Sequence, residues 1–99
     1  MASIPKLLMD EFYSMERAAL AESNYGAAQV FSSCESMVNN LLHGRHPAEV
    51  LGRCRKIFEE NAQNERFEEG SRAAYAEAVI VVDLFAEQYG LELTTEATS

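Results

Sequence analysis

Two cysteines and two histidines are the side chains of this chain best suited to hold a metal ion. Cys34, His43, His46 and Cys54 form the pattern C-x8-H-x2-H-x7-C, and thiolates and imidazoles are the usual ligands of structural zinc. Such sites usually pair two ligands on each side, whereas here only the histidines are close in sequence. Both cysteines also fall at apolar helical positions, where a free thiol serves as a small hydrophobic side chain. We therefore expect core cysteines, loop histidines and no metal or other cofactor.

Nucleophilic catalysis needs a Ser or Cys together with a base and an acid, and the sequence has no recognisable arrangement of that kind. Motifs such as G-x-S-x-G and H-E-x-x-H are absent. The adjacent carboxylates at 10–11, 59–60 and 68–69 splay about 100° apart on a helix, so they do not converge. A di-iron site in a four-helix bundle would need a Glu-x-x-His motif, which the chain lacks. We expect a protein that is not an enzyme.

Apolar residues at helical spacing predict two helices in the first half of the chain. The first has Ser3 as its cap and Pro5 in its first turn, and it ends near Glu22. The second follows Asn24, whose side chain can cap it, and runs to about residue 42. Gly44 then suits a helix end and Pro47 can only open the next helix.

The second half predicts a helix from Pro47 and another over residues 67–89, with a break near the polar residues 61–64. Asn and Gln only weaken a helix, so one continuous helix over 47–89 is the alternative. Gly90 supplies the stop, Leu91 can pack back on the helix end, and 91–99 reads as a flexible tail. The predicted fold class is all-α: one domain over residues 1–90 with four helices in two antiparallel hairpins, or three helices if the last two are continuous.

The helix over 67–89 is apolar on almost every side in its second half. We expect it to be central to the fold and to share its surplus apolar face with a second subunit, because a 99-residue chain buries only part of its apolar surface alone. The predicted homodimer interface contains Ile80, Asp83 and Leu84. Asp83 interrupts the apolar run AVIVVDLFA, so it either points out of the bundle or meets a basic or hydroxyl partner.

The first predicted hairpin resembles a tetratricopeptide repeat over residues 12 to about 31. It departs from that pattern because no glycine precedes Asn24, because the closing proline comes late, and because the next unit starts 42 residues after Tyr25 instead of about 34. The resemblance implies a helical hairpin and an adaptor or chaperone that holds a partner helix in an apolar groove. The residues that carry it are Phe12, Tyr13, Met15, Ala19, Asn24, Tyr25 and Ala28.

Composition favours a folded protein and excludes several classes of partner. The chain has 16 acidic and 8 basic residues and a formal charge of −8, so it repels phosphate backbones and we expect no direct binding of nucleic acid. The N-terminus has no sustained apolar core of a secretory signal, and no apolar run reaches the length of a membrane span. With only two cysteines, we expect reduced thiols, a cytoplasmic location and no membrane partner.

Charge is unevenly distributed along the chain: residues 43–56 carry a local +3 and residues 57–99 a local −8. An acidic second half can engage the cationic surface of a protein partner, although ordinary solvated helices with pairs such as Arg55 and Glu59 would show the same pattern. Small acidic chains without catalytic groups are common among phage-encoded inhibitors of host nucleic-acid machinery, including anti-CRISPR proteins. We therefore expect a protein that binds and occludes such a partner, and the helix-holding adaptor is the alternative. The candidate partner-binding residues, which would imitate phosphate charge, are Glu59, Glu60, Glu65, Glu68 and Glu69.

Overall fold

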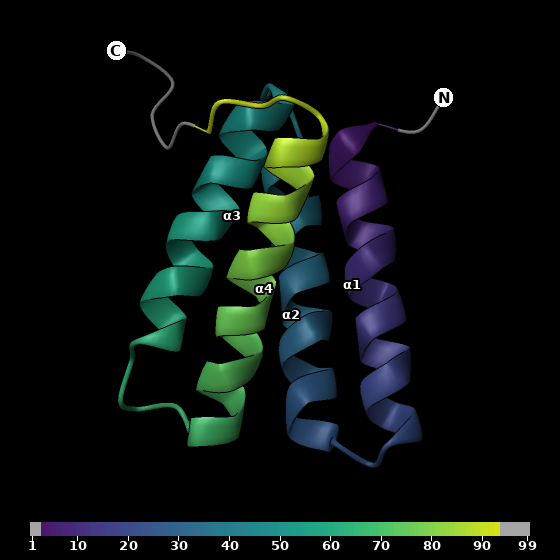
Figure 1. Ribbon diagram of the computed structural model, residues 1–99, viewed down its shortest axis with the longest axis vertical. Helices are drawn as coiled ribbons and strands as arrows, with labels where there is room; N and C mark the ends of the chain where they lie inside the picture. Colours follow the sequence, from purple (N-terminus) through teal and green to yellow (C-terminus); the bar gives the residue numbers. More distant parts are fainter. Residues whose placement is uncertain (1–2, 94–99) are drawn as a thin grey trace.

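The computed structural model describes residues 3–93, and within them the chain is helical with no strand. The first hairpin pairs α1 (Ile4–Ala21) with α2 (Tyr25–Leu41), and the second pairs α3 (Pro47–Ala62) with α4 (Glu69–Gln88). Figure 1 shows the four helices side by side, with the α1–α2 and α3–α4 connections at one end of the bundle and the start of α1 and the end of α4 at the other. The predicted all-α fold with two hairpins is confirmed.

Helix ends follow the predicted caps because each is fixed by local hydrogen bonds. The Ser3 hydroxyl accepts the Lys6 N–H at 3.2 Å, and the Asn24 side-chain oxygen accepts the Ala27 N–H at 3.2 Å. These bonds satisfy amide groups that the first turn of a helix leaves without partners. At the other end of the chain, Gly90 adopts φ +64° and the Leu91 N–H donates to the Ala86 carbonyl at 2.8 Å. This is the Schellman ending that the sequence predicted.

The second hairpin has two separate helices, so the alternative of one continuous helix over 47–89 is wrong. α3 ends at Ala62, and α4 begins at Glu69, two residues later than the predicted start at Phe67. The reason is a turn in which the Phe67 N–H donates to the Asn64 carbonyl at 3.0 Å, followed by extended backbone at Glu68. The polar stretch 61–64 therefore does end a helix.

Side chains from both hairpins meet in one hydrophobic core. Phe12 of α1 and Phe58 of α3 pack edge to face with ring centroids 5.7 Å apart, a favourable aromatic geometry. Phe58 also packs on Tyr75 of α4 at 6.2 Å, so the aromatic rings connect three helices. Leu91 and Leu93 pack against this core from beyond α4. The remaining part of the predicted tail, 94–99, lies outside the described residues.

The central position belongs to α2 and not to α4, which corrects the expectation from the sequence. α2 packs extensively on α1 and also contacts α3 and α4, as Figure 1 shows by its place behind α4 and beside α1. α4 buries one face, yet Ile80 is 57% and Leu84 is 58% exposed on the opposite side. An apolar helix can thus keep part of its apolar surface in solvent when its neighbours all lie on one side of it. None of the helices within residues 3–93 has the length and apolar character needed to cross a membrane.

Candidate binding surfaces

The two cysteines lie in the core, as the sequence predicted, and neither is exposed. Burial raises the pKa of Cys34 to about 12, with a further contribution from the nearby Cys54. Burial likewise raises the pKa of Cys54 to about 12. A thiol with such a pKa stays protonated at neutral pH, and the thiolate is the form that attacks electrophiles or binds metals. These side chains therefore act as packing groups.

His43 and His46 lie in the loop between α2 and α3 and are exposed to solvent. Cys34 and Cys54, in contrast, are fully buried. Within residues 3–93, no three His, Cys, Asp or Glu side chains are grouped so that they could hold a metal ion. The four-ligand arrangement suggested by spacing is not assembled in the fold.

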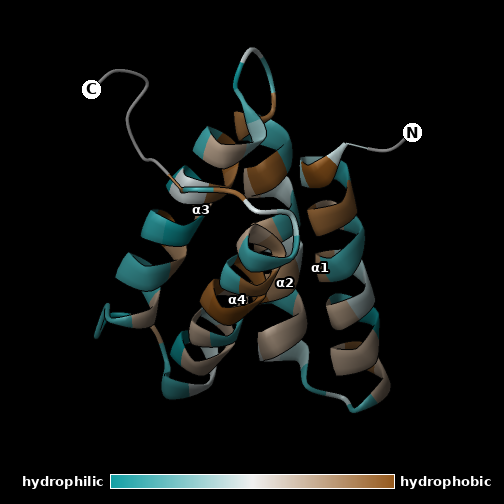
Figure 2. Ribbon diagram, turned by 45° about the horizontal axis from the view of Figure 1, so that its top comes forward, coloured by the Kyte–Doolittle hydropathy of each residue, from teal (hydrophilic) through white to brown (hydrophobic). Residues whose placement is uncertain are grey.

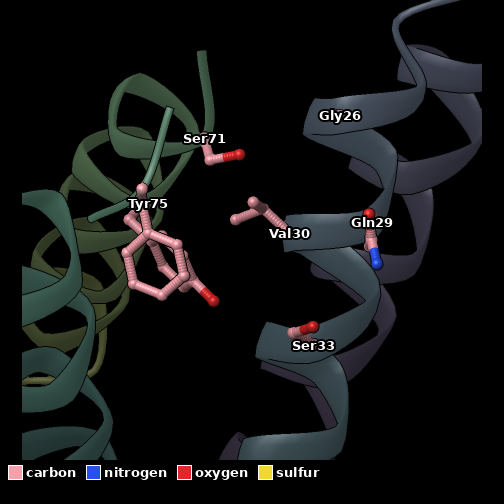
Figure 3. Close-up of a pocket in the computed structure, with 7 residues that line it drawn as sticks. Gly26, Gln29, Val30, Ser33, Ser71 and Tyr75 are labelled. Atoms are coloured by element: carbon pink, nitrogen blue, oxygen red, sulfur yellow. The ribbon is translucent and has the colours of Figure 1, made fainter. Parts of the chain in front are cut away.

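A cavity of about 200 Å³ lies between α2 and α4 and is lined by uncharged side chains. Figure 3 shows Val30 on α2 and Ser71 and Tyr75 on α4 around this space. Tyr75 is the one ionisable group among the seven lining residues, and burial raises its pKa above the ordinary value. The lining therefore offers no base or nucleophile that would be active near neutral pH. Its residues are Gly26, Gln29, Val30, Ser33, Phe67, Ser71 and Tyr75.

The five candidate glutamates lie together in sequence at the end of the bundle where α3 connects to α4, and all five are exposed. We call this surface the acidic junction: Glu59, Glu60, Glu65, Glu68 and Glu69. Figure 2 shows mostly hydrophilic colour on the outward side of α3 and in its loop to α4. Within residues 3–93, the one ion pair made by these carboxylates joins Glu59 to Arg55 at 3.2 Å, which was the predicted helical pair. The other four carboxylates keep their charge directed to solvent.

The helix dipoles of α3 and α4 have opposite effects on the stability of the glutamates in the acidic junction. Glu68 and Glu69 occupy the cap and first residue of α4, where the positive end of the helix dipole favours acids. Glu59 and Glu60 lie instead in the last turn of α3, which contains no basic residue. The negative end of that helix dipole disfavours acids. Glu60, which has no ion pair within residues 3–93, therefore lowers the stability of its own helix.

Two arginines of the basic segment around the α2–α3 loop share one acid, Glu49. The half-buried Glu49 carboxylate accepts hydrogen bonds from Arg45 at 3.1 Å and from Arg53 at 2.8 Å. Arg45 also donates to the Leu41 carbonyl at 3.3 Å, which fixes the loop on the end of α2. Arg45 and Arg53 therefore hold the loop and the start of α3 together, while the local +3 charge, which already counts Glu49, is unchanged by these contacts.

Asp83 is exposed and also meets a basic partner, so both of the outcomes that the sequence offered for it occur. The Arg55 guanidinium on α3 donates to both carboxylate oxygens of Asp83, at 2.7 and 3.3 Å. This hydrogen bonding raises the pKa of Arg55 above its ordinary value. Asp83 is therefore engaged within its own chain, whereas Ile80 and Leu84 of the predicted dimer interface remain exposed. The homodimer itself stays a prediction.

A second hollow, of about 210 Å³, lies between α1 and α2. Its lining includes Met15 and Ala18 of α1, Glu22 directly after that helix, and Ala27 of α2, and Glu77 is the one residue that α4 contributes. We call it the α1–α2 hollow. The sequence analysis missed it, because it treated each helix separately.

Comparison with known proteins gives no assignment for this fold and these surfaces. No protein-family model, no curated protein and no solved structure matches the chain.

Proposed function

We propose that this protein is a non-catalytic binding protein that occupies a cationic surface on a protein partner with its acidic junction. The observation that carries the proposal is the exposure of Glu59, Glu60, Glu65, Glu68 and Glu69 at one end of the helical hairpin formed by α3 and α4. Closely spaced carboxylates create a local negative potential that attracts Lys and Arg side chains and raises association rates. A partner that normally binds phosphate groups would present such a cationic surface.

The unfavourable placement of Glu60 supports this function over simple solubility. A solubilising acid would be equally effective at a helix N-terminus, where it would also stabilise the fold. Residues that lower stability are often retained because function requires them. Within this proposal the protein belongs with phage-type inhibitors, such as anti-CRISPR proteins, that occlude a nucleic-acid-binding complex.

The test is affinity capture of the partner from a lysate of the native host, followed by a binding assay with the purified partner. Three reversals at the acidic junction, Glu60→Lys, Glu65→Lys and Glu68→Lys, should abolish binding and competition with the partner's nucleic acid. Binding of the unmodified protein should weaken steeply as salt rises from low to physiological concentration, because exposed charges are screened.

A control variant has three charge reversals on the first hairpin instead: Asp10→Lys, Glu16→Lys and Glu35→Lys. It changes the net charge of the protein by the same amount as the junction variant. This control should bind within a few fold of the unmodified protein at physiological salt, which would show that position matters more than total charge. Retained binding by the junction variant would contradict the proposal.

A further inference from the structure

The α1–α2 hollow combines an apolar lining with two carboxylates. Most of its lining residues are apolar, among them Met15 of α1 and Ala27 of α2, and its two acids are Glu22 and Glu77. Both glutamates are exposed to solvent, so both carry their charge at neutral pH. The hollow therefore presents two negative charges beside an apolar surface.

The cations of this chain leave the two carboxylates unneutralised. Within residues 3–93, neither Glu22 nor Glu77 forms an ion pair, and none of the lining residues is basic. Arg17 belongs to the same helix as Met15, but it follows Met15 by two residues and is rotated about 200° from it around the helix. The two charges are thus available to a cation from outside the chain.

The helix ends at the hollow do not reverse its charge. The lining includes Ala18 from the last turn of α1 and Ala27 from the first turn of α2, so the negative end of one helix dipole lies beside the positive end of the other. The Asn24 side-chain oxygen also accepts the Ala27 N–H at 3.2 Å, which covers one amide group at the start of α2. Because the two dipoles offset each other, the carboxylates of Glu22 and Glu77 determine the sign of the potential.

The size of the hollow suits one side chain better than a whole small molecule. Its volume is about 210 Å³, whereas ligand pockets usually have about 300–1,000 Å³. Lysine and arginine lay an apolar stem along apolar surface and keep the charged end beside it. An aliphatic side chain would leave the two acids without a partner, and an acidic side chain would be repelled.

From this match we propose that the α1–α2 hollow receives one lysine or arginine side chain of a partner protein. The stem would lie against Met15 and Ala27, and the charged end would meet Glu22 and Glu77. Side chains that fill a pocket in this way are typical anchors of protein interfaces.

The hollow and the acidic junction are placed so that one partner can contact both. The α1–α2 and α3–α4 connections lie at the same end of the bundle (Figure 1). Glu77 follows Glu69 of the acidic junction by eight residues of α4, which corresponds to about 12 Å along the helix. That a single partner contacts both surfaces rests on the proposed function, whereas the binding of a cationic side chain in the hollow does not. The test therefore uses a probe in place of the partner.

The probe is Nα-acetyl-lysine methylamide, titrated at physiological salt into isotope-labelled protein and followed by amide shifts in NMR spectra. The shifts should saturate at Met15, Ala27 and the other lining residues, with the roughly millimolar affinity expected of a ligand with few atoms. The norleucine analogue has the same stem without the charge, and methylammonium has the charge without the stem. Each should bind at the hollow at least about threefold more weakly than the lysine probe.

Two matched pairs of variants locate the binding. Glu77→Gln removes one charge from the hollow and should weaken lysine binding at least about threefold. Glu87→Gln makes the same change at an exposed position of α4 outside the lining and should keep the affinity within about twofold. Ala18→Leu narrows the hollow and keeps both acids, so it should also weaken binding, whereas Ala76→Leu at an exposed position outside the lining should not. All four positions are exposed, so each variant should keep the helical circular dichroism spectrum.

Several results would overturn the proposal. One is equal weakening by both members of either pair of variants, and another is equal binding of the norleucine analogue or of methylammonium. Hollow shifts that depend on protein concentration without any probe would do the same, because a second copy would then be the occupant. Probe shifts confined to the acidic junction would contradict the hollow site alone. Partner binding by the junction variant contradicts only the proposed function, so the two proposals fail separately.

Discussion

Arg55 and Asp83 form a two-point ion pair that joins α3 to α4 across the second hairpin. Arg55 Nε lies 2.7 Å from Asp83 Oδ1, and Arg55 Nη2 lies 3.3 Å from Oδ2. The planar guanidinium matches the carboxylate in a way that a lysine ammonium does not. The pair thus joins two helices at Asp83, which interrupts the apolar run 78–86 of α4.

We predict that this pair contributes modestly to stability, because its side chains are 35% and 47% exposed and solvent screens exposed ion pairs. Asp83→Asn should lower the free energy of unfolding by about 0.5–1 kcal/mol. Urea denaturation of Asp83→Asn, Arg55→Lys and the double variant should give a positive coupling that shrinks in 1 M salt. If the changes in the free energy of unfolding of the two single variants simply add in the double variant, the ion pair does not stabilise the fold.

A second prediction concerns alkaline pH and the two buried thiols. The folded thiols have a pKa of about 12, compared with an ordinary value of 9.0. Between these values the unfolded chain releases thiol protons that the folded chain retains. The free energy of unfolding should therefore fall as pH rises from 9 towards 12, by up to about 1.4 kcal/mol per pH unit for each thiol, and thiol ionisation should have no effect well below pH 9.

Cys34→Ala isolates the thiol contribution from that of other groups that titrate in this range. The variant should lose about 1–2 kcal/mol at neutral pH through lost packing, and its stability should fall less steeply above pH 9. Chemical denaturation at a series of pH values measures both effects. An identical pH dependence in both proteins would mean that Cys34 titrates normally in the folded state.

The third prediction is that one substitution at two glutamates of the acidic junction has opposite effects on stability. Glu60→Lys replaces an acid by a base in the last turn of α3 and should stabilise the fold by about 0.3–1 kcal/mol. Glu68→Lys makes the same change at the start of α4 and should destabilise it by a similar amount. Thermal melts at low salt measure both shifts, which should diminish at high salt. Shifts of the same sign would show that net charge, and not the helix dipole, governs this surface.

Features fixed by neighbouring residues could be predicted from the sequence, whereas features fixed by helix packing could not. The caps at Ser3 and Asn24 and the ending at Gly90 depend on bonds within a few residues, so composition and spacing were sufficient. The partner of Asp83 lies 28 residues away, and its identity depends on how α3 and α4 align.

The α1–α2 hollow illustrates the same limit for a candidate site. Its lining combines residues of α1 and α2 with Glu77 of α4, and that grouping depends on how the helices pack. The central helix was misassigned for a related reason. Apolar content made α4 look enclosed, although burial depends on how many neighbours a helix has. The acidic junction was easier, because consecutive glutamates at a helix boundary are exposed in almost any packing.

The last prediction concerns the turn between α1 and α2, where Ser23 adopts φ +59°. Here the Asn24 N–H donates to the Ala19 carbonyl at 2.8 Å, so this turn has the same form as the one at Gly90, yet a side chain occupies the left-handed position. That conformation costs a non-glycine residue about 1–2 kcal/mol. Ser23→Gly should remove most of this strain and raise the free energy of unfolding by about 0.5–1 kcal/mol. The gain is smaller than the strain because glycine makes the unfolded chain more flexible, which offsets part of it.

Gly90→Ala is the matched opposite change, because it introduces a side chain at φ +64°. An added Cβ there would meet no atom within 4 Å, so any loss of stability, expected at about 1 kcal/mol, comes from the backbone conformation and not from a steric clash. Urea denaturation of both variants measures these effects. A destabilised Ser23→Gly protein would show that the Ser23 side chain contributes more than its backbone strain costs.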